Sequence, residues 1–170
     1  MVQIVQVVSS TKLLLDSVNK LLPQQSPSKK DKILTKDELE KCLKNKNFYL
    51  LIAFKKGIPV GVGTVFFQKN LRRWIAEIHD VVVDCDYRKQ GIGTEIVKKL
   101  VTTAKDFAEK NKAKIKLYLT SRPARKEANN LYKKLGFVQV AKAQGSWGTN
   151  LYKLIINEEA VIVDIREDIM

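Results

Sequence analysis

The segment with the clearest chemical meaning is residues 81–94, where an apolar run leads through a short polar turn into a helix-like run. Two glycines, Gly91 and Gly93, lie where this helix is expected to begin. A glycine-bearing turn that enters a helix exposes backbone N–H groups at the positive end of the helix dipole, and such an end binds phosphate. Glycine before a helix is also common in ordinary turns, so these residues alone leave both interpretations open.

Two motifs together carry a family resemblance. Residues 88–93, Arg-Lys-Gln-Gly-Ile-Gly, resemble the Arg/Gln-x-x-Gly-x-Gly/Ala loop of the GNAT acetyltransferases. Residues 128–137, Ala-Asn-Asn-Leu-Tyr-Lys-Lys-Leu-Gly-Phe, resemble the later Ala-x-x-Leu-Tyr-x-x-x-Gly-Phe motif of the same family. The resemblance extends over nearly all of residues 1–156. It implies an N-acetyltransferase that moves an acetyl group from acetyl-coenzyme A directly to a primary amine of a small molecule or peptide.

The resemblance also implies how acetyl-coenzyme A would be held. Backbone N–H groups from Lys89 to Thr94 would surround the pyrophosphate, and the strand Val81–Val83 would pair with the pantetheine amides like an added strand. Many family members carry Asn seven residues before the motif tyrosine, where this chain has Arg125, whose side chain would either reach a phosphate or lie in solvent. The residues expected at the cofactor are Val81, Val82, Val83, Arg88, Lys89, Gln90, Gly91, Ile92, Gly93, Thr94, Arg125 and Asn129.

Tyr132 is the candidate general acid. In the family this tyrosine lies near the thioester sulfur, and a phenol with a pKa near 10 is protonated at pH 7 and can donate to a thiolate. The same residue lies on or beside the apolar face of its helix, so core packing is the alternative interpretation.

Glu77 is the candidate base, because its place before the loop resembles that of a glutamate base in some members. Strand alternation predicts that Glu77, His79, Val81 and Val83 share one face of a strand, with Asp80 on the other. His79 or Asp80, water, or no dedicated base remain alternatives. His79 is the one histidine of the chain, and histidine is the side-chain type whose ordinary pKa lies closest to neutral pH.

These residues require a framework of strands and helices in the order β-α-α-β-β-β-α-β-α-β-β. Ser9, Ser10 and Thr11 offer a cap for a first helix, and the capping box that begins at Thr35 predicts a second. Helical spacing predicts two more helices, across Gly91–Lys110 and Ala124–Leu135. The expected fold is α/β (α+β): the GNAT fold, a mixed, mostly antiparallel twisted sheet of about seven strands with helices on both faces, splayed at the cofactor-binding strands. The expected strands are Val2–Val8, Phe48–Phe54, Val60–Gln68, Trp74–Val83, Lys114–Leu119, Phe137–Ala143 and Leu151–Ile156. We expect one domain over residues 1–156, followed by an acidic tail over residues 157–170.

The acceptor is not encoded in these motifs. In this fold its cleft would be lined by Leu13–Lys46, Asn70–Arg73 and Gln144–Asn150.

Composition narrows the function classes. Thirty-one Lys and Arg against 18 Asp and Glu give a formal net charge of +13, which favours polyanionic partners such as nucleic acid or a phosphorylated cofactor. No nucleic-acid motif accompanies this charge, so a nucleic-acid-binding module is the less favoured alternative, beside a cofactor-binding protein without catalysis. No apolar run approaches the roughly 20 residues of a membrane span, and no secretory signal begins the chain.

We therefore expect a cytoplasmic protein whose partners are acetyl-coenzyme A and an unidentified amine, with a homodimer left open. Cys42 and Cys85 fit no metal spacing, so no metal site is expected.

Overall fold

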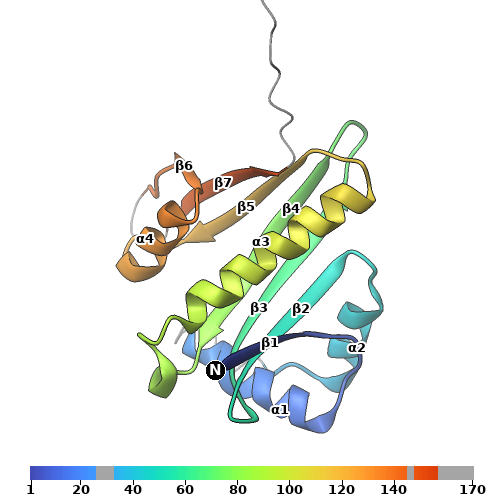
Figure 1. Cartoon of the computed structure of the whole chain (residues 1–170), viewed down its shortest axis with the longest axis vertical. Coiled ribbons are helices and arrows are strands. Elements are labelled where there is room, and N and C mark those ends of the chain that lie inside the picture. Colours follow the sequence, from blue (N-terminus) through green and yellow to red (C-terminus); the bar gives the residue numbers. More distant parts are fainter. Residues whose placement is uncertain (26–32, 145–147, 157–170) are drawn as a thin grey trace, which may run out of the picture.

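The structure is a computed structural model that describes residues 1–25, 33–144 and 148–156. Seven strands form one sheet in the order β1-β2-β3-β4-β5-β7-β6 (Figure 1). Strands β4 and β5 are parallel and every other neighbouring pair is antiparallel. The strands are β1 (Val2–Val7), β2 (Phe48–Lys55), β3 (Ile58–Lys69), β4 (Trp74–Val83), β5 (Ile115–Ser121), β6 (Val138–Ala141) and β7 (Asn150–Ile156).

Helices cover both faces of the sheet (Figure 1). On one face, α3 (Ile92–Lys110) and α4 (Lys126–Lys134) lie over a core that includes Phe67 and Leu117. On the other face, α1 (Lys12–Leu21) and α2 (Lys36–Lys44) pack on Leu50 and Ile52, next to the β1 side of the sheet. The predicted element order and fold class are therefore confirmed.

Local sequence explains where these helices begin. The Thr11 hydroxyl accepts from the Leu14 amide at 3.2 Å and so begins α1. Thr35 and Glu38 form the predicted capping box at the start of α2, where each side chain accepts from the other residue's backbone N–H. Glycine in β3 then allows α3 to approach closely: a Cβ on Gly63 would lie 2.6 Å from Ile96 Cγ2, inside van der Waals contact. The helix that bears the glycine loop is thereby seated tightly on the centre of the sheet.

The parallel pair opens at the end where the glycine loop follows. Pairing between β4 and β5 runs from Trp74–Ile115 to Ile78–Leu119 and then ends. Beyond that point β4 stays paired with β3, up to Val83 opposite Gly61, whereas β5 stays paired with β7. The two strands thus diverge between residues 79–83 and 120–121, and this gap is the predicted splay.

A β-bulge in β4 corrects one prediction. Register with β3 shifts between Thr64–His79 and Val62–Val82, and Asp80 adopts a positive φ of 52°. A bulge reverses the alternation of side chains beyond it. Ala76 and Ile78 before the bulge, and Val81 and Val83 after it, all pack on the α3 side, so Glu77 and His79 do not share a face with Val81 and Val83.

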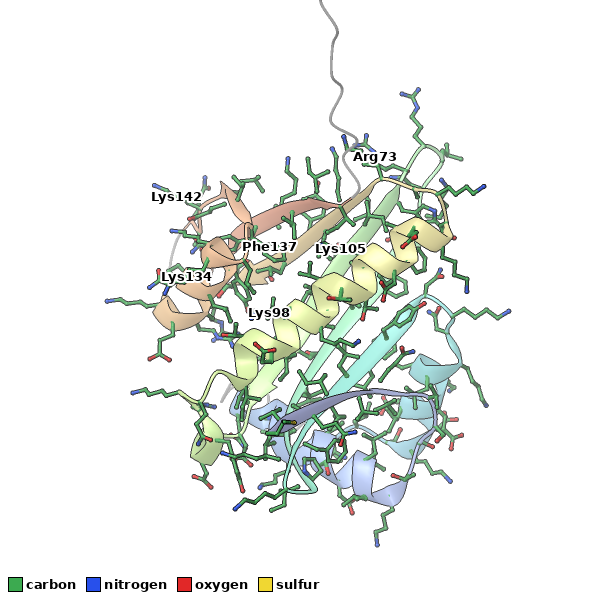
Figure 2. The ribbon with its side chains drawn as sticks, viewed as in Figure 1. Arg73, Lys98, Lys105, Lys134, Phe137 and Lys142 are labelled. Carbon is green, nitrogen blue, oxygen red and sulfur yellow. The ribbon has the colours of Figure 1, made fainter. Side chains whose placement is uncertain are left out.

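Lysines on the outward faces of the helices are exposed, as Figure 2 shows for Lys98 and Lys105 on α3 and Lys134 on α4. Within the described ranges, no helix combines the length and the apolar character that a membrane crossing requires. The predicted tail over residues 157–170 lies outside the described residues, so its prediction stays untested.

Candidate functional site

A cavity of about 640 Å³ opens at the splay, between the end of β4, the beginning of α3 and α4. Ten of the twelve residues expected at the cofactor line it. They are Val81, Val82, Val83, Arg88, Lys89, Gly91, Ile92, Gly93, Thr94 and Arg125. Gln90 and Asn129 are not among its lining residues.

The loop before α3 has the backbone geometry of an anion cradle. Lys89 and Gly91 both adopt left-handed conformations, with φ of 60° and 78°, and Gly91 is the N-cap of α3. Left-handed residues in such a turn direct successive N–H groups into one concavity, and the helix dipole adds positive potential there. A Cβ built on Gly91 would meet no atom within 4 Å, so glycine is favoured here by its positive φ and leaves open space in front of the loop.

Two arginines contact the exposed edge of β4. Arg88 donates from Nε to the Val83 carbonyl at 3.1 Å, and its Nη2 reaches the Gln24 carbonyl at 3.5 Å. Arg125, the N-cap of α4, donates from Nη2 to the Val81 carbonyl at 3.3 Å. The Arg125 side chain therefore does not lie free in solvent. Its guanidinium bonds to the protein's own main chain and joins α4 to β4 across the splay.

The Asn129 side chain makes hydrogen bonds within the protein. It is 7 % exposed, and its Nδ2 donates to the carbonyls of Arg122 and Arg125 at 2.9 and 2.8 Å. Its Oδ1 accepts from the Tyr152 hydroxyl at 2.8 Å, which ties α4 to β7. Gln90 is exposed and accepts from Lys55 Nζ. Asn129 and Gln90 therefore do not line the cavity with the other expected cofactor residues.

Tyr132 lies at the inner end of the cavity, 3 % exposed, on the α4 face two turns from Arg125. Its ring packs against Phe137 and Tyr152, with centroids 6.1 and 5.8 Å away. Burial raises the pKa of the phenol, and the positive charge of Arg125 acts in the opposite direction. The side chain is thus a buried, protonated phenol that also borders a ligand-sized space.

Two smaller cavities lie beside β4 and β5 at the splay. One of about 240 Å³ is lined by Tyr132 together with His79 and Asp80. Another of about 370 Å³ is lined by His79, Glu77 and Tyr118. The His79 Nε2 and Glu77 Oε2 lie 3.0 Å apart, and both side chains are about half exposed. The candidate acid and base therefore lie on opposite faces of the sheet, connected through the gap between β4 and β5.

Several residues that line these cavities were not among those expected at the cofactor. Gln25, just beyond the 3-10 helix Leu22–Gln24, borders the first two cavities, and Lys126 and Glu127 border the first. Gln24 Oε1 accepts from the Cys85 amide at 2.8 Å, although the two residues are 61 positions apart. No short-range pattern signals such a contact. Of the three segments expected around an acceptor, Asn70–Arg73 lies at the far end of β4 and lines none of these cavities.

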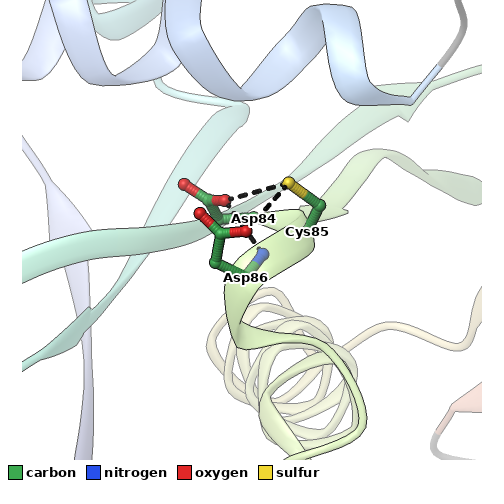
Figure 3. A group of neighbouring side chains, drawn as sticks. All are labelled: Asp84, Cys85 and Asp86. Carbon is green, nitrogen blue, oxygen red and sulfur yellow. Dashed lines mark hydrogen bonds between the residues drawn. The ribbon is translucent and has the colours of Figure 1, made fainter.

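The turn after β4 holds an acidic group, Asp84, Cys85 and Asp86 (Figure 3). Asp84 is 2 % exposed, and its carboxylate accepts from Lys20 at 2.9 Å and from the Asp86 amide at 3.3 Å. The hydrogen bond from Lys20 lowers the pKa of Asp84. Partial desolvation and the carboxylate of Asp86 raise the pKa of the Cys85 thiol. These contacts account for the group as the cap of the 3-10 helix Cys85–Tyr87.

Residues 15–137 match the model of the acetyltransferase (GNAT) family. The chain belongs to this family. The match includes the glycine loop, the splayed strands and Tyr132. An uncharacterised N-acetyltransferase of Methanocaldococcus jannaschii is 35 % identical over 74 residues, which span 44 % of this chain and 30 % of that relative.

Solved structures share the fold of this GNAT chain. A GNAT acetyltransferase from Streptococcus pneumoniae has a TM-score of 0.71 at 21 % identity, with 91 % of this chain and 99 % of that one covered. Aminoglycoside 6′-acetyltransferase type Ii has a TM-score of 0.69 at 23 % identity, covering 89 % and 96 %. A chain of the NatC complex bound to Gag peptide and coenzyme A has a TM-score of 0.64 at 18 % identity, covering 91 % and 98 %.

Proposed function

We propose that this GNAT protein transfers an acetyl group from acetyl-coenzyme A to a primary amine of a small molecule or peptide, by direct transfer. One observation carries the proposal. A single cavity is bordered by the left-handed loop at Lys89 and Gly91, by the end of β4 that is no longer paired with β5, and by the phenol of Tyr132. An anion cradle, an edge for amide pairing and an acid are the parts needed for a phosphorylated thioester donor.

The donor would bind with its phosphates at the beginning of α3, where backbone N–H groups and the helix dipole attract anions. Its pantetheine arm would run along Val81 and Val83 into the splay, because an extended chain with amide groups can extend a sheet edge. The thioester would then lie beside Tyr132. Bound coenzyme A in the NatC structure, a protein of the same fold, supports this choice of donor.

The acceptor would enter from the other face of the sheet. Glu77 and His79 border one cavity on that side, and His79 Nε2 lies 3.0 Å from Glu77 Oε2. One of them would take a proton from the ammonium, directly or through water, so that the neutral amine can attack the thioester carbonyl. As the C–N bond forms, the C–S bond would break and Tyr132 would donate its proton to the departing thiolate. The acylated nitrogen would lose its extra proton, and uptake of one proton would restore the phenol. With the acid and the base on opposite faces, the amine would approach from one side of the gap between β4 and β5, and the thiolate would leave on the other side.

The acceptor's identity stays open between small amines and peptide amines, since relatives of this fold include an aminoglycoside acetyltransferase and a complex with a peptide. A cytoplasmic location and the homodimer remain predictions.

A thiol-release screen tests the proposal. The purified chain is incubated with acetyl-coenzyme A and a panel of amines, amino acids and peptides, and free coenzyme A is measured. We expect release above the slow hydrolytic background with at least one primary amine. Calorimetry with coenzyme A alone is the companion measurement, and the proposal fails if neither binding at millimolar ligand nor release is found.

A further inference from the structure

Both carbonyls on the open edge of β4 already carry hydrogen bonds from arginine side chains. The Asp84 amide bonds to the Val60 carbonyl of β3, so the strand positions that alternate with it, Val81 and Val83, turn their main chain towards the splay. Arg125 donates a hydrogen bond to the Val81 carbonyl, and Arg88 donates one to the Val83 carbonyl. These are the main-chain groups that a pantetheine arm paired along this edge would use.

The two arginines differ in how firmly they are held. Arg88 lies within the loop before α3, and its guanidinium also reaches the Gln24 carbonyl. The 3.3 Å bond of Arg125 is longer than the usual value of roughly 2.9–3.0 Å for an N–H···O bond. Arg125 is therefore the side chain that an incoming amide can replace more readily.

The backbone of Arg125 would not need to move. Its carbonyl accepts from the Asn129 amide at 3.0 Å and from Asn129 Nδ2 at 2.8 Å, and Asn129 is anchored on the Tyr152 hydroxyl. The end of α4 is thus fixed on β7 while the guanidinium extends back over the splay. Only side-chain rotation is required to free the Val81 carbonyl, and Arg125 borders the first two cavities, which offer space on either side.

We propose that Arg125 is a stand-in for the donor's pantetheine amide: it satisfies the Val81 carbonyl in the donor-free protein and is displaced when the donor pairs with β4. The inference rests on the proposed function and extends it. The Val81 carbonyl is partly buried, and losing its partner would cost a hydrogen bond there, so the arginine stabilises the open edge before the donor arrives. Because only the uncapped form can pair with the donor, the apparent affinity is reduced by the fraction of molecules in that form.

The test uses calorimetry on the full chain with two ligands. Coenzyme A carries the pantetheine arm, and adenosine 3′,5′-bisphosphate carries the nucleotide end without it. Arg125→Met removes the hydrogen-bond donor and the charge but keeps a long side chain. Lys126 is the next residue of the same cavity wall and, within the described residues, makes no hydrogen bond to β4, so Lys126→Met measures the loss of electrostatic attraction alone.

Relative to Lys126→Met, Arg125→Met should bind coenzyme A about three- to tenfold more tightly, as expected for freeing one hydrogen-bonded carbonyl. Affinity for the bisphosphate should be equal in the two variants. Arg125→Lys keeps a donor and a charge, so it should bind like the natural chain. Arg125→Ala provides a second neutral variant if the methionine variant folds poorly, and it should bind coenzyme A more tightly than Lys126→Met as well.

Equal or weaker coenzyme A binding in both neutral Arg125 variants, compared with Lys126→Met, would overturn the inference and leave the proposed function standing. An equal change in affinity for coenzyme A and for the bisphosphate would also overturn the inference, because the arginine would then act on the phosphates. Failure of the natural chain to bind coenzyme A would instead overturn the proposed function, and this inference with it.

Discussion

Lys20 Nζ lies 2.9 Å from Asp84 Oδ2, and this ion pair joins α1 to the turn that leads from β4 into the glycine loop. The carboxylate is 2 % exposed whereas the lysine side chain is 64 % exposed, so the pair sits at the boundary between core and solvent. The hydrogen bond from Lys20 lowers the pKa of Asp84. The pair therefore holds the loop against the α1 side of the sheet in its ionised form.

Lys20→Met should lower the urea midpoint of unfolding at pH 7, because the buried carboxylate of Asp84 loses its partner. A group whose pKa is lower in the folded than in the unfolded state stabilises the fold above its unfolded pKa, near 3.9 for Asp, and loses this contribution as pH falls through the folded pKa. The difference between natural chain and variant should therefore shrink below about pH 4. Lys12→Met, at the exposed start of α1, is the control and should leave the urea midpoint unchanged both at pH 7 and below about pH 4. If the urea midpoints of the natural chain and Lys20→Met differed by the same amount at every pH, the charge of Asp84 would not be involved.

Gly91→Glu should reduce coenzyme A affinity by about 100-fold or more, because a carboxylate would enter the open space before α3 and repel the pyrophosphate. Gly91→Ala is the matched control. Both variants must adopt the positive φ of 78°, which costs roughly 1–2 kcal/mol for a residue with a Cβ, so their stabilities should fall together. The alanine variant should keep affinity within several-fold of the natural chain, since its Cβ meets no atom within 4 Å. Normal affinity in the glutamate variant, measured by calorimetry, would mean that the loop is only a turn.

Asn129→Ala should destabilise the fold by about 2–3 kcal/mol, because the Tyr152 hydroxyl and the carbonyls of Arg122 and Arg125 lose a buried partner. Coenzyme A affinity of the folded variant should stay within a few-fold. Asn130→Ala, at the exposed neighbouring position, should change neither quantity. Denaturant unfolding and calorimetry on the same samples separate the two effects. A large loss of affinity with unchanged stability would restore Asn129 to the cofactor site.

The fold was predictable because its signals are local. Caps at Thr11 and Thr35, the glycine loop and alternating strands are each set within a few residues, and the observed strand Trp74–Val83 coincides with the prediction. The prediction that Glu77 and Val81 share a face was wrong because strand alternation assumes regular pairing, and the bulge at Asp80 depends on register with β3. Periodicity in β4 alone contains no such information.

The same limit applies to the site. Tyr132 was singled out because a motif surrounds it, and the structure shows that it lines the cavity beside the glycine loop. The motif did not indicate the internal role of Asn129, since its partner Tyr152 is 23 residues away on β7. The bond of Arg125 to Val81 joins residues 44 positions apart across a gap that exists only in the folded chain.

Tyr132→Phe gives the most direct test of the catalytic account. The turnover number and the coenzyme A dissociation constant are measured for the natural chain and the variant, with the acceptor found in the thiol-release screen or with slow thioester hydrolysis. Tyr152→Phe is the matched control, since it removes a neighbouring buried hydroxyl that bonds to Asn129 and so should lower stability alone. If Tyr132 protonates the leaving thiolate, turnover should fall by about 10- to 100-fold, at or below the usual range for general acids because this thiolate leaves fairly well unprotonated, while the dissociation constant stays near normal. An unchanged turnover number in the folded Tyr132→Phe variant would contradict the account and leave Tyr132 as a core residue.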